Sequence, residues 1–411
     1  MSRIAYVAGQ YPLVSLTFIQ REIAALRDLG LDVITCSMRR TSPDQHPGEA
    51  EKAEAAATFH VIEAMKRPAT FFAAQGSALR HPGRYFSALR LAWATRAPGM
   101  KAALYQLAYF FEATVLARHA LREGVTHFHA HFTTGAATVA MLASDLTGRP
   151  YSFTLHGPAD FLEPYRWKIG EKAARARFVA TISHYARSQL MFHTDPKHWD
   201  RLHIVHCGVP PERYAGEGAR ADGETRLVFV GRFAPVKGLR LLIEAMSRLA
   251  DDLPDLTLTL VGDGEDRAVI EAAAKPLGDR VRFTGYLSQD AVAKELKSAD
   301  IAVLPSFAEG VPVFLMEALA SGTPVIATQV AGVGELVEDG KSGRLVPPGD
   351  IDSLTDAIRT LAADPAARRA MGATGRARVV DDFDIRIEAA RLATLFEGAA
   401  PDIRPVPHSA L

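Results

Sequence analysis

Residues 301–350 constrain the fold of this 411-residue chain more than any other stretch. The apolar run 301–304 is typical of a buried strand, and Pro312 suits the first turn of a helix, where a missing N–H costs nothing. Gly322 ends that helix, and 324–328 is the next apolar run. The stretch is therefore predicted to form a strand, a helix and a second strand, with one face of the helix packed inward.

Two carboxylates stand near the start of this helix, Glu309 in the turn and Glu317 within the helix. A helical rise of about 1.5 Å per residue would separate them by roughly 12 Å along the axis. That distance is too long for a shared proton, but it suits the two ends of one extended ligand. The free N–H groups of the first helical turn favour an anion such as phosphate. The alternative is a solvated Glu309 and a Glu317 that is merely a good helix former.

A wider pattern around these glutamates carries a family resemblance. It consists of Glu309-x7-Glu317, Gly322-Thr323-Pro324-Val325 and Gly332-x-Gly334-Glu335. This pattern resembles the signature of the retaining, nucleotide-sugar-dependent glycosyltransferases of family 4. The resemblance implies the GT-B fold, in which two doubly wound, Rossmann-like α/β domains face a central cleft and a C-terminal helix crosses back to the first domain.

The resemblance also implies roles for residues of this stretch. Glu309 is expected to contact hydroxyls of the donor sugar, and Glu317 to hold the ribose. A cradle of backbone amides toward the sugar and the diphosphate is expected from Gly310, Val311, Pro312, Val313 and Phe314.

Two cations follow the apolar run 227–230. Gly231 and Arg232 come directly after it, and Lys237 stands near the start of the next helix. Cations just past a strand end suit a diphosphate, although two ordinary surface cations would give the same pattern. The resemblance implies that Arg232 and Lys237 neutralise the leaving diphosphate, so that no metal or other cofactor is needed. Further donor contacts are expected from Gly262, Tyr286 and Leu287.

The chain begins with a predicted strand at 4–8, a helix at 15–29 and a strand at 31–36, which indicates parallel, doubly wound α/β structure. Ser15 is placed to cap the helix. The first loop lacks the Gly-Gly pair of many relatives. It resembles instead a branch associated with bacterial exopolysaccharide assembly, in which a Ser/Thr-Phe-Ile-x-Arg-Glu run follows the first strand. Acceptor binding is assigned here to Ser15 and Thr17.

Three histidines, His127, His129 and His131, alternate along another predicted strand and share one face. A metal site is one interpretation. No Asp, Glu or Cys at ligand spacing joins them in the sequence, and the family has a His-Ala-His here without a structural metal, so no metal is predicted. His131, nearest the carboxyl end of the strand, is expected to face the interdomain crevice and contact the acceptor.

A strand at 150–155 ends in His156-Gly157-Pro158-Ala159-Asp160. A histidine at a strand end beside a glycine suits donation of a hydrogen bond to a sugar hydroxyl or a developing charge, whereas a lone loop histidine would be ordinary. The segment resembles the family's His-Gly-x-x-Asp loop, in which the histidine approaches the transferred sugar. Asp160 is either an acceptor contact or the cap of a helix at Phe161. The candidates for catalysis are His156, Arg232, Lys237 and Glu309.

Residues 65–123 read as a basic, aromatic, helical segment, with nine Lys or Arg against Glu112 and Glu123. Such a segment can lie on an anionic membrane surface, which suits enzymes that act on lipid-linked acceptors. The alternative is that the apolar positions are core and the cations form the hydrated face. Peripheral membrane contact is thus one of two hypotheses.

Bulk composition restricts partners and compartment. Lys plus Arg and Asp plus Glu are both 47, so nothing suggests a nucleic-acid partner. Two cysteines cannot form a framework of disulfides, which points to a reducing compartment. The N-terminal residues enter a strand without a secretory leader, and no apolar run reaches the ~18 residues of a spanning helix. A cytoplasmic protein is expected, with the inner face of the cell membrane as the place of work under the membrane hypothesis.

The polar, glycine-rich stretch after Pro210 and Pro211 marks an expected connector. The predicted domains are 1–207, which binds the acceptor; 208–380, which binds the nucleotide sugar; and 381–411, which holds the returning helix and a loose tail.

These features together predict a retaining, metal-independent glycosyltransferase of the hexosyltransferase type. It would move a sugar from a UDP- or GDP-sugar to a glycan or lipid-linked acceptor in cell-surface polysaccharide biosynthesis. A sugar phosphorylase or a nucleotide-sugar epimerase can share this architecture, and a non-catalytic nucleotide-sugar-binding partner is a third alternative. The intact candidate side chains argue against the third. A dinucleotide oxidoreductase is disfavoured because no Gly-x-Gly-x-x-Gly follows the first strand.

Overall fold

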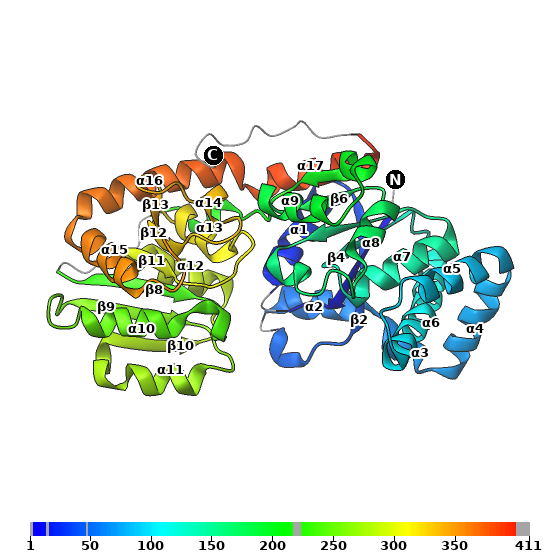
Figure 1. The fold of residues 1–411 in the computed structure, drawn as a ribbon, viewed down its shortest axis with the longest axis horizontal. Coiled ribbons are helices and arrows are strands. Elements are labelled where there is room, and N and C mark those ends of the chain that lie inside the picture. The colour runs from blue at the N-terminus through cyan, green and yellow to red at the C-terminus, as the bar shows by residue number, and fades with distance from the viewer. Residues whose placement is uncertain (1–2, 14–15, 47, 217–222, 400–411) are drawn as a thin grey trace. The chain divides into compact units, whose positions relative to one another are not determined.

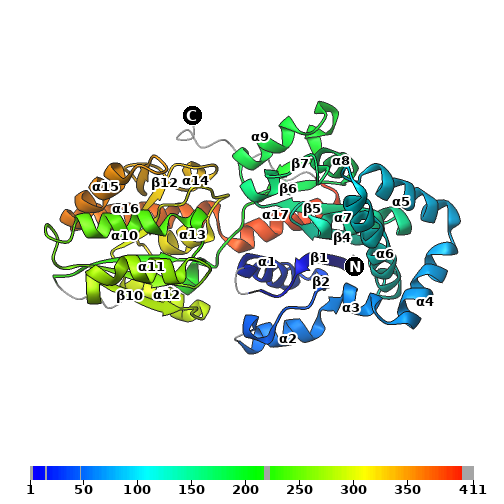
Figure 2. The same ribbon diagram turned by 60° about the horizontal axis from the view of Figure 1, so that its bottom comes forward.

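A computed structural model describes residues 3–13, 16–46, 48–216 and 223–399 of the chain. It divides into two units. The first takes the chain up to His206 and the residues from Ala389 onward in the last helix, and the second runs from Cys207 to Glu388. Each unit is a parallel sheet with helices packed on it (Figure 1 and Figure 2).

The sheet of the first unit has seven parallel strands in the order β3-β2-β1-β4-β5-β6-β7. These strands are β1 (Arg3–Gln10), β2 (Asp32–Arg39), β3 (Phe59–His60), β4 (His127–His131), β5 (Tyr151–Leu155), β6 (Val179–Thr181) and β7 (Leu202–Ile204). Every residue of β4 and β5 is buried, because a parallel sheet is covered on both faces. Since β1 pairs with both β2 and β4, the strand order reverses between β1 and β4, and this is the topological switch point of the sheet.

The helices of the first unit connect its strands. They are α1 (Thr17–Asp28), α2 (Glu49–Ala57), α3 (Val61–Met65), α4 (Pro68–Leu79), α5 (Pro82–Ala94), α6 (Met100–Arg122), α7 (Gly135–Thr147), α8 (Ile169–Arg175) and α9 (His184–Phe192). The predicted helical segment 65–123 is confirmed, and its helices α4, α5 and α6 pack beside one another (Figure 2). Ser183 caps α9 as a side-chain acceptor. Ser15, the predicted cap of α1, lies outside the described residues.

The sheet of the second unit has six parallel strands in the order β10-β9-β8-β11-β12-β13. These strands are β8 (Thr225–Val230), β9 (Leu256–Val261), β10 (Val281–Gly285), β11 (Ile301–Leu304), β12 (Val325–Thr328) and β13 (Gly343–Val346). Because β8 pairs with both β9 and β11, the switch point of this sheet lies between β8 and β11. Both sheets thus have the doubly wound, Rossmann-like topology that the sequence predicts.

The helices of the second unit are α10 (Leu239–Arg248), α11 (Arg267–Ala274), α12 (Gln289–Ser298), α13 (Val313–Ala320), α14 (Val333–Leu336), α15 (Ile351–Ala363) and α16 (Pro365–Asp382). The last helix, α17 (Ile385–Glu397), begins in this unit and continues into the first, where Phe396 packs against His129 and Phe178 with ring centroids 5.2 and 5.4 Å apart. Within the described ranges, no helix combines the length and apolarity that crossing a membrane requires.

Candidate active site

The loops that follow β8 and β11 meet at the switch point of the second sheet. A short 3-10 turn, η6 (Pro235–Lys237), lies between β8 and α10, and Gly238 ends it with a φ of 65°. A Cβ at Gly238 would lie only 2.1 Å from the carbonyl oxygen of Pro305, so only glycine lets the two loops approach this closely. The backbone N–H of Phe307 also donates to the carbonyl of Val236, at 2.8 Å.

This loop packing brings two predicted site residues together. The Nζ of Lys237 donates to Oε1 of Glu309 at 2.6 Å, in an ion pair whose side chains are 24% and 10% exposed. The sequence predicts both residues for the donor site, but separately, Glu309 for the sugar and Lys237 for the diphosphate. The structure shows instead that each is the other's partner.

Other donor candidates lie on the loops that follow β8, β9 and β10. The N–H of Gly231 donates to Val261, and that of Gly262 donates to Gly285, at 3.0 and 2.9 Å. Gly262 has a φ of 131°, and a Cβ there would lie 1.9 Å from the carbonyl oxygen of Gly231, so these loops also pack backbone against backbone. Two large side chains, Arg232 and Tyr286, are exposed beside them.

Tyr286 and Leu287 follow β10 directly. The Tyr286 hydroxyl donates to the carbonyl of Asp263 at 3.3 Å, which holds the ring over the loop after β9. Leu287 is half-buried. Within the described residues, the guanidinium of Arg232 forms no hydrogen bond or ion pair, so its charge is available to an anion.

The start of α13 differs from the prediction by one residue. Pro312 is the N-cap with extended dihedral angles, and the helix begins at Val313. Pro312 has no N–H and cannot donate to a ligand, so it does not belong to the predicted amide cradle. Its carbonyl accepts from Leu315 and Met316. No backbone carbonyl among the described residues accepts from the amides of Val313 and Phe314, which open the helix.

Glu317 is buried on the second turn of α13. It is 7% exposed, and its Oε1 accepts from the hydroxyl of Tyr214 at 2.8 Å. Tyr214 ends the 3-10 turn η5 (Pro211–Tyr214), at the start of the second unit. Tyr214 is not among the predicted site residues, because no sequence pattern links it to a helical glutamate 103 positions away.

In the first unit, the histidines of β4 form a polar network inside the sheet. His129 contacts the hydroxyls of Ser152 and Thr154 through its two ring nitrogens, at 2.7 and 2.9 Å. His127 reaches the same Ser152 at 2.7 Å. Burial lowers the pKa of His129 well below its usual range and that of His127 to about 3, so both imidazoles are neutral.

His131, at the carboxyl end of β4, contacts His156, a predicted catalytic residue, and Glu22, the last residue of the Ser/Thr-Phe-Ile-x-Arg-Glu run. Its Nδ1 lies 2.8 Å from Nε2 of His156, and its Nε2 lies 3.3 Å from Oε1 of Glu22 on α1. Burial and the neighbouring His131 hold the pKa of His156 well below its usual range. His156 is neutral at pH 7 for that reason.

Glu22 changes the interpretation of the histidine row. One ligand atom from each of Glu22, His129 and His131 falls within a group whose atoms all lie within 4.8 Å of one another. The sequence near the strand offers no carboxylate for these histidines, because Glu22 comes from α1, the helix after β1. Both ring nitrogens of His129 already face hydroxyls, so the arrangement fits a hydrogen-bonded network better than a metal site.

Asp160 holds the His156 loop through hydrogen bonds. It lies inside the 3-10 turn η3 (Pro158–Phe161) and does not cap it. Its carboxylate accepts from the N–H and hydroxyl of Thr133 at 2.7 and 2.9 Å, and from the N–H of His156 at 2.9 Å. Lys172 is buried next to this cluster and donates to the carbonyls of Thr133 and Thr134. Asp160 therefore joins the loops after β4 and β5, and it is itself 3% exposed.

Thr17, the described member of the two acceptor candidates in the first loop, is the first residue of α1 and is half-buried. Phe18, next to it, packs against the ring of His156 with centroids 4.7 Å apart. The start of α1 and the His156 loop are thus neighbours at the switch point of the first sheet.

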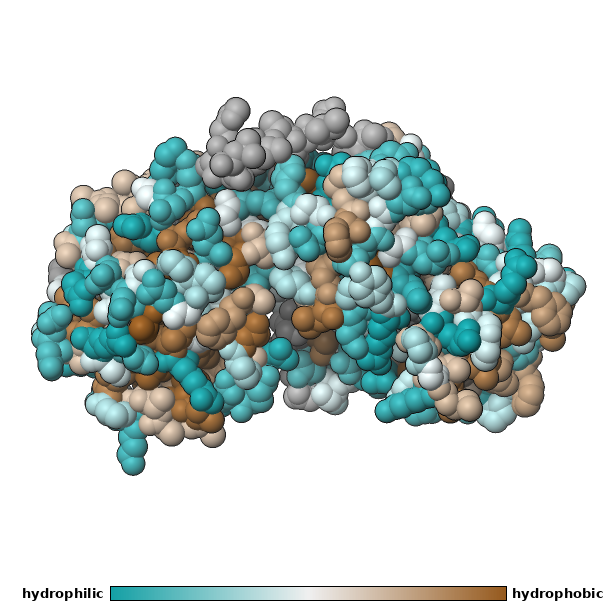
Figure 3. Space-filling model, viewed as in Figure 1, coloured by the Kyte–Doolittle hydropathy of each residue, from teal (hydrophilic) through white to brown (hydrophobic). Residues whose placement is uncertain are grey.

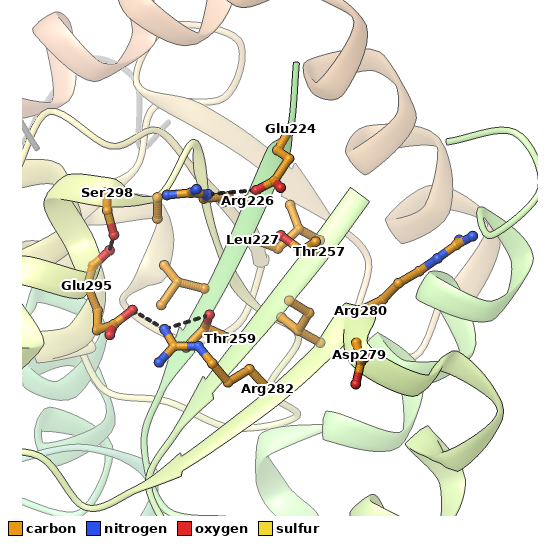
Figure 4. A pocket seen from close by; sticks show the side chains of 13 residues that line it. Glu224, Arg226, Leu227, Thr257, Thr259, Asp279, Arg280, Arg282, Glu295 and Ser298 are labelled. Carbon is orange, nitrogen blue, oxygen red and sulfur yellow. Dashed lines mark hydrogen bonds and ion pairs between the residues drawn. The ribbon is translucent and has the colours of Figure 1, made fainter. Parts of the chain in front are cut away.

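A hollow of about 330 Å³ lies elsewhere in the second unit (Figure 4). It is lined at the amino ends of β8 and β9 and before β10, with Arg226 facing Glu224 and Arg282 facing Glu295 in Figure 4. Ligands of doubly wound sheets bind at the carboxyl ends of the strands. This hollow is at the opposite end of the strands, and two of its three arginines, Arg226 and Arg282, are paired with glutamates, so it is not part of the candidate site.

Comparison with known proteins agrees with this geometry. The model of the family described as glycosyl transferases group 1 matches residues 212–378, and that of glycosyltransferase family 4 matches residues 17–213. A D-inositol 3-phosphate glycosyltransferase of Kribbella flavida is 30% identical over 298 residues, which cover 64% of this chain and 69% of that protein. The chain belongs to the group 1 glycosyltransferases.

Other relatives of the family are matched over less of their length. A GDP-mannose-dependent phosphatidylinositol monomannoside mannosyltransferase of Mycolicibacterium smegmatis is 32% identical over 54% of this chain and 63% of its own. A glycogen synthase of Mycobacterium tuberculosis is 32% identical over 48% of each chain. The chain thus spans about half to two thirds of these curated glycosyltransferases.

Solved structures show the fold over nearly the whole chain. Sucrose-phosphate synthase of Thermosynechococcus elongatus has a TM-score of 0.74 at 21% identity, covering 97% of this chain and 98% of that one. Anabaena HepE, in complex with UDP and glucose, has a TM-score of 0.71 at 18% identity, covering 97% and 100%. These likenesses confirm the predicted GT-B fold of this glycosyltransferase.

Proposed function

We propose that this glycosyltransferase moves a sugar, with retention of configuration, from a nucleotide diphosphate donor to a glycan or lipid-linked acceptor in cell-surface polysaccharide synthesis. The observation that carries the proposal is the ion pair of Lys237 with Glu309, which lies beside the first turn of α13 at the switch point of the second sheet. A cation, helical amides and a carboxylate occur there together. A diphosphate and the hydroxyls of a sugar need these three kinds of group.

In the proposed donor site, different loops of the second unit bind different parts of the nucleotide sugar. Arg232 and Lys237 neutralise the diphosphate, Glu309 accepts from sugar hydroxyls, and the buried Glu317 accepts from the ribose. Tyr286 and Leu287 contact the nucleobase. The chemistry of UDP in the HepE complex and of GDP-mannose in the mycobacterial relative supports a donor of this class.

The proposed reaction occurs on one face of the sugar. The bond between the anomeric carbon and the diphosphate oxygen breaks, and the acceptor oxygen forms its bond on the same face. The proton of the acceptor hydroxyl passes to the departing phosphate oxygen, and the products are the α-glycoside and the nucleoside diphosphate. Arg232 and Lys237 stabilise the charge that develops on the diphosphate. These two cations supply the charge that a divalent metal would otherwise provide, and we therefore propose a metal-independent reaction.

Calorimetry with a panel of UDP- and GDP-sugars, in the presence of a chelator, tests the donor site. One donor is expected to bind to the intact protein, and Glu317→Ala is expected to weaken it. The matched control is Glu295→Ala, on α12 beside the hollow at the amino ends of the strands, which is expected to bind as the unmodified protein does. Absence of binding by every donor, or equal weakening by the two variants, would contradict the proposal. Donor isomerisation without acceptor, or phosphate-dependent glycan breakdown, would indicate an epimerase or a phosphorylase instead.

We also propose that α4, α5 and α6 contact an anionic membrane. Large apolar side chains on these helices are exposed, among them Phe72 at 69%, Trp93 at 61% and Met100 at 80%. Arg80, Arg90 and Lys101 are exposed on the same helices or the turns between them. Figure 3 shows apolar and hydrophilic residues intermixed over this part of the molecule. Exposed aromatic residues among cations suit the interface of an anionic bilayer, where lipid-linked acceptors are found.

Flotation with liposomes tests the membrane contact. Binding to vesicles that contain anionic lipid is expected at low salt, and the double variant Phe72→Ser/Trp93→Ser is expected to lose it. The matched control, Phe192→Ser, removes an aromatic residue of the same unit on α9 that is 79% exposed. No binding by the unmodified protein at low salt would end this hypothesis.

A further inference from the structure

We propose that a hollow beside α6 in the first unit, the α6 hollow, binds a phosphate group of the acceptor. It measures about 170 Å³ and lies between α6, the start of α7, and α8 with the residues just before it. These helices are neighbours in Figure 1. The inference rests on the proposed function only for the statement that the phosphate belongs to an acceptor. The anion site itself follows from contacts within the first unit.

The lining of the α6 hollow is positively charged. Lys101, Arg166 and Lys172 line it, and no Asp or Glu of the described ranges does. The hollow of the second unit differs, because its lining pairs arginines with glutamates. Acidic and basic residues are equal in number over the whole chain, so this excess of cations is local. Lysine and arginine together suit a phosphate.

Two of these cations have donors available to a ligand. Lys101 is exposed in the first turn of α6, and its ammonium forms no hydrogen bond or ion pair with the described part of the chain. Arg166 contacts Glu163 through Nη1 alone, at 2.8 and 2.9 Å to the two carboxylate oxygens. A surface ion pair of this kind is weak, and the other guanidinium nitrogens of Arg166 remain available.

Tyr109 adds a neutral donor to the same hollow. Its ring packs against Gly135, where a Cβ would come within 3.1 Å of the ring, so the start of α7 holds the tyrosine in place. Burial and the nearby Glu112 raise the pKa of Tyr109, so the hydroxyl keeps its proton. This hydroxyl forms no hydrogen bond with any residue that the structure describes, and it can therefore donate to an anion.

Lys172 and Trp167 form a buried part of the lining. Lys172 is 1% exposed, and its Nζ lies 5.4 Å from the centroid of the Trp167 ring. Burial lowers the pKa of Lys172 to about 7. An anion in the hollow would favour the charged form of this lysine, because opposite charges stabilise each other most strongly where water is excluded.

The size of the α6 hollow restricts what it takes. Sites that hold a whole small molecule usually measure about 300–1,000 Å³. A hollow of about 170 Å³ is smaller than that range, so it takes one group of a larger ligand and not a nucleotide sugar. A phosphate ester is such a group, and its several oxygens accept from lysine, arginine and tyrosine at once.

Lys172 connects the hollow to the loops of the acceptor candidates. Its Nζ donates to the carbonyls of Thr133 and Thr134, in the loop after β4. The N–H and hydroxyl of Thr133 donate to Asp160, which also accepts from the N–H of His156. The hollow and the His156 loop thus belong to one hydrogen-bonded network at the carboxyl edge of the sheet, where ligands of doubly wound sheets bind. This location assigns the phosphate to the acceptor.

The turn between α5 and α6 favours a lipid-linked source for the phosphate. Met100, which precedes Lys101 in the chain, is 80% exposed, and Trp93 at the end of α5 is 61% exposed. Both belong to the proposed membrane contact, so a phosphate bound by Lys101 would lie at the level of the lipid headgroups. A free sugar phosphate carries the same charged group and is the other source.

Binding can be observed at Trp167 itself, without turnover. The chain has three tryptophans, and protein labelled with 5-fluorotryptophan gives one ¹⁹F resonance for each, assigned from the three single Trp→Phe variants. Inorganic phosphate, titrated at constant ionic strength, is expected to shift the Trp167 resonance to saturation. Absence of this shift overturns the inference even where calorimetry shows a donor bound to the second unit, so the two proposals fail separately.

Lys101→Ala and Tyr109→Phe test the donors of the hollow. Each is expected to weaken phosphate binding by roughly 10-fold, the scale of one hydrogen bond to a charged group. Tyr109→Phe keeps the ring against Gly135, so it removes the hydroxyl without disturbing the packing. The matched control is Arg122→Ala, which removes an exposed cation at the other end of α6 and is expected to bind phosphate normally. Equal affinities in all four proteins, or equal weakening by the control, would contradict a specific site.

Three further probes in the same titration identify the source of the phosphate. Farnesyl diphosphate represents a lipid-linked acceptor, glucose 1-phosphate a soluble one, and glucose lacks the charged group. Tighter binding of farnesyl diphosphate supports the lipid-linked source, and tighter binding of glucose 1-phosphate supports the soluble source. A shift of Trp167 by glucose as large as that by glucose 1-phosphate would overturn phosphate recognition.

Discussion

The Nζ of Lys237 and the Oε1 of Glu309 lie 2.6 Å apart, although the two residues are 72 positions apart in the chain. The contact joins the loops after β8 and β11, the two strands that flank the switch point of the second sheet. In the structure each side chain is the other's partner. In the proposed function, a diphosphate takes Lys237 as its partner and Glu309 accepts from hydroxyls of the sugar, so donor binding would replace the ion pair by these two contacts.

Replacement of Lys237 by alanine is expected to reduce turnover far more than stability. Removal of one charge-stabilising donor typically lowers kcat by roughly 10²–10³-fold. The partly exposed pair itself contributes only about 1 kcal/mol or less to the free energy of unfolding. Steady-state kinetics and thermal unfolding of the same preparation check both expectations.

The matched control for Lys237→Ala is Arg240→Ala, which removes an exposed cation in the first turn of α10, three positions later. It is expected to retain turnover. Near-normal turnover in Lys237→Ala would exclude the assigned role, as would an equal loss in the control.

Substitution of Tyr214 by phenylalanine is expected to weaken donor binding by roughly 10-fold, since the loss of one hydrogen bond to a buried carboxylate corresponds to about 1.5 kcal/mol. The hydroxyl of Tyr214 donates to Oε1 of Glu317, so the substitution removes one of the contacts that orient the carboxylate proposed to bind the ribose. Calorimetric titration of the nucleoside diphosphate checks this. Tyr165→Phe, at an exposed tyrosine of the first unit, is the control and is expected to bind normally.

The sequence predicts well what is local along the chain. The strands and helices near the site follow from apolar runs, glycines and caps, and Arg232, Lys237, Glu309 and Glu317 lie in recognisable motifs. Contacts between residues at distant positions in the chain could not be predicted from the sequence. Tyr214 belongs to no motif, and the run that contains Glu22 does not indicate which residue Glu22 contacts; only the fold places them beside Glu317 and His131.

A second class of misprediction concerns the backbone. Pro312 was expected to open α13 and to belong to the amide cradle, but its position at the N-cap and its missing N–H exclude it from donating. Asp160 does not cap a helix but joins two loops, and its contact with an acceptor stays a prediction. In both cases one residue type suits several roles, and the loop geometry decides among them.

Gly262→Ala is expected to be strongly destabilising. The added Cβ would lie 1.9 Å from the carbonyl oxygen of Gly231, and a φ of 131° is strained for any residue with a side chain. A loss of roughly 2–4 kcal/mol in the free energy of unfolding is expected from these two effects. The control is Gly334→Ala in α14, where a Cβ meets no atom within 4 Å, and denaturant unfolding is expected to show little change.

The stability contribution of Lys172 is expected to depend on pH. Burial lowers the pKa of Lys172 to about 7, while the unfolded chain keeps the usual value near 10.5, and the buried Asp160 nearby partly opposes this lowering. Between these two values the unfolded state binds more protons than the folded state, so stability rises with pH. The unmodified protein is expected to gain roughly 1.4 kcal/mol per pH unit relative to Lys172→Met over this window. Urea unfolding of both proteins from pH 7 to pH 9 measures the difference, and a constant difference across that range would show that Lys172 keeps an ordinary pKa.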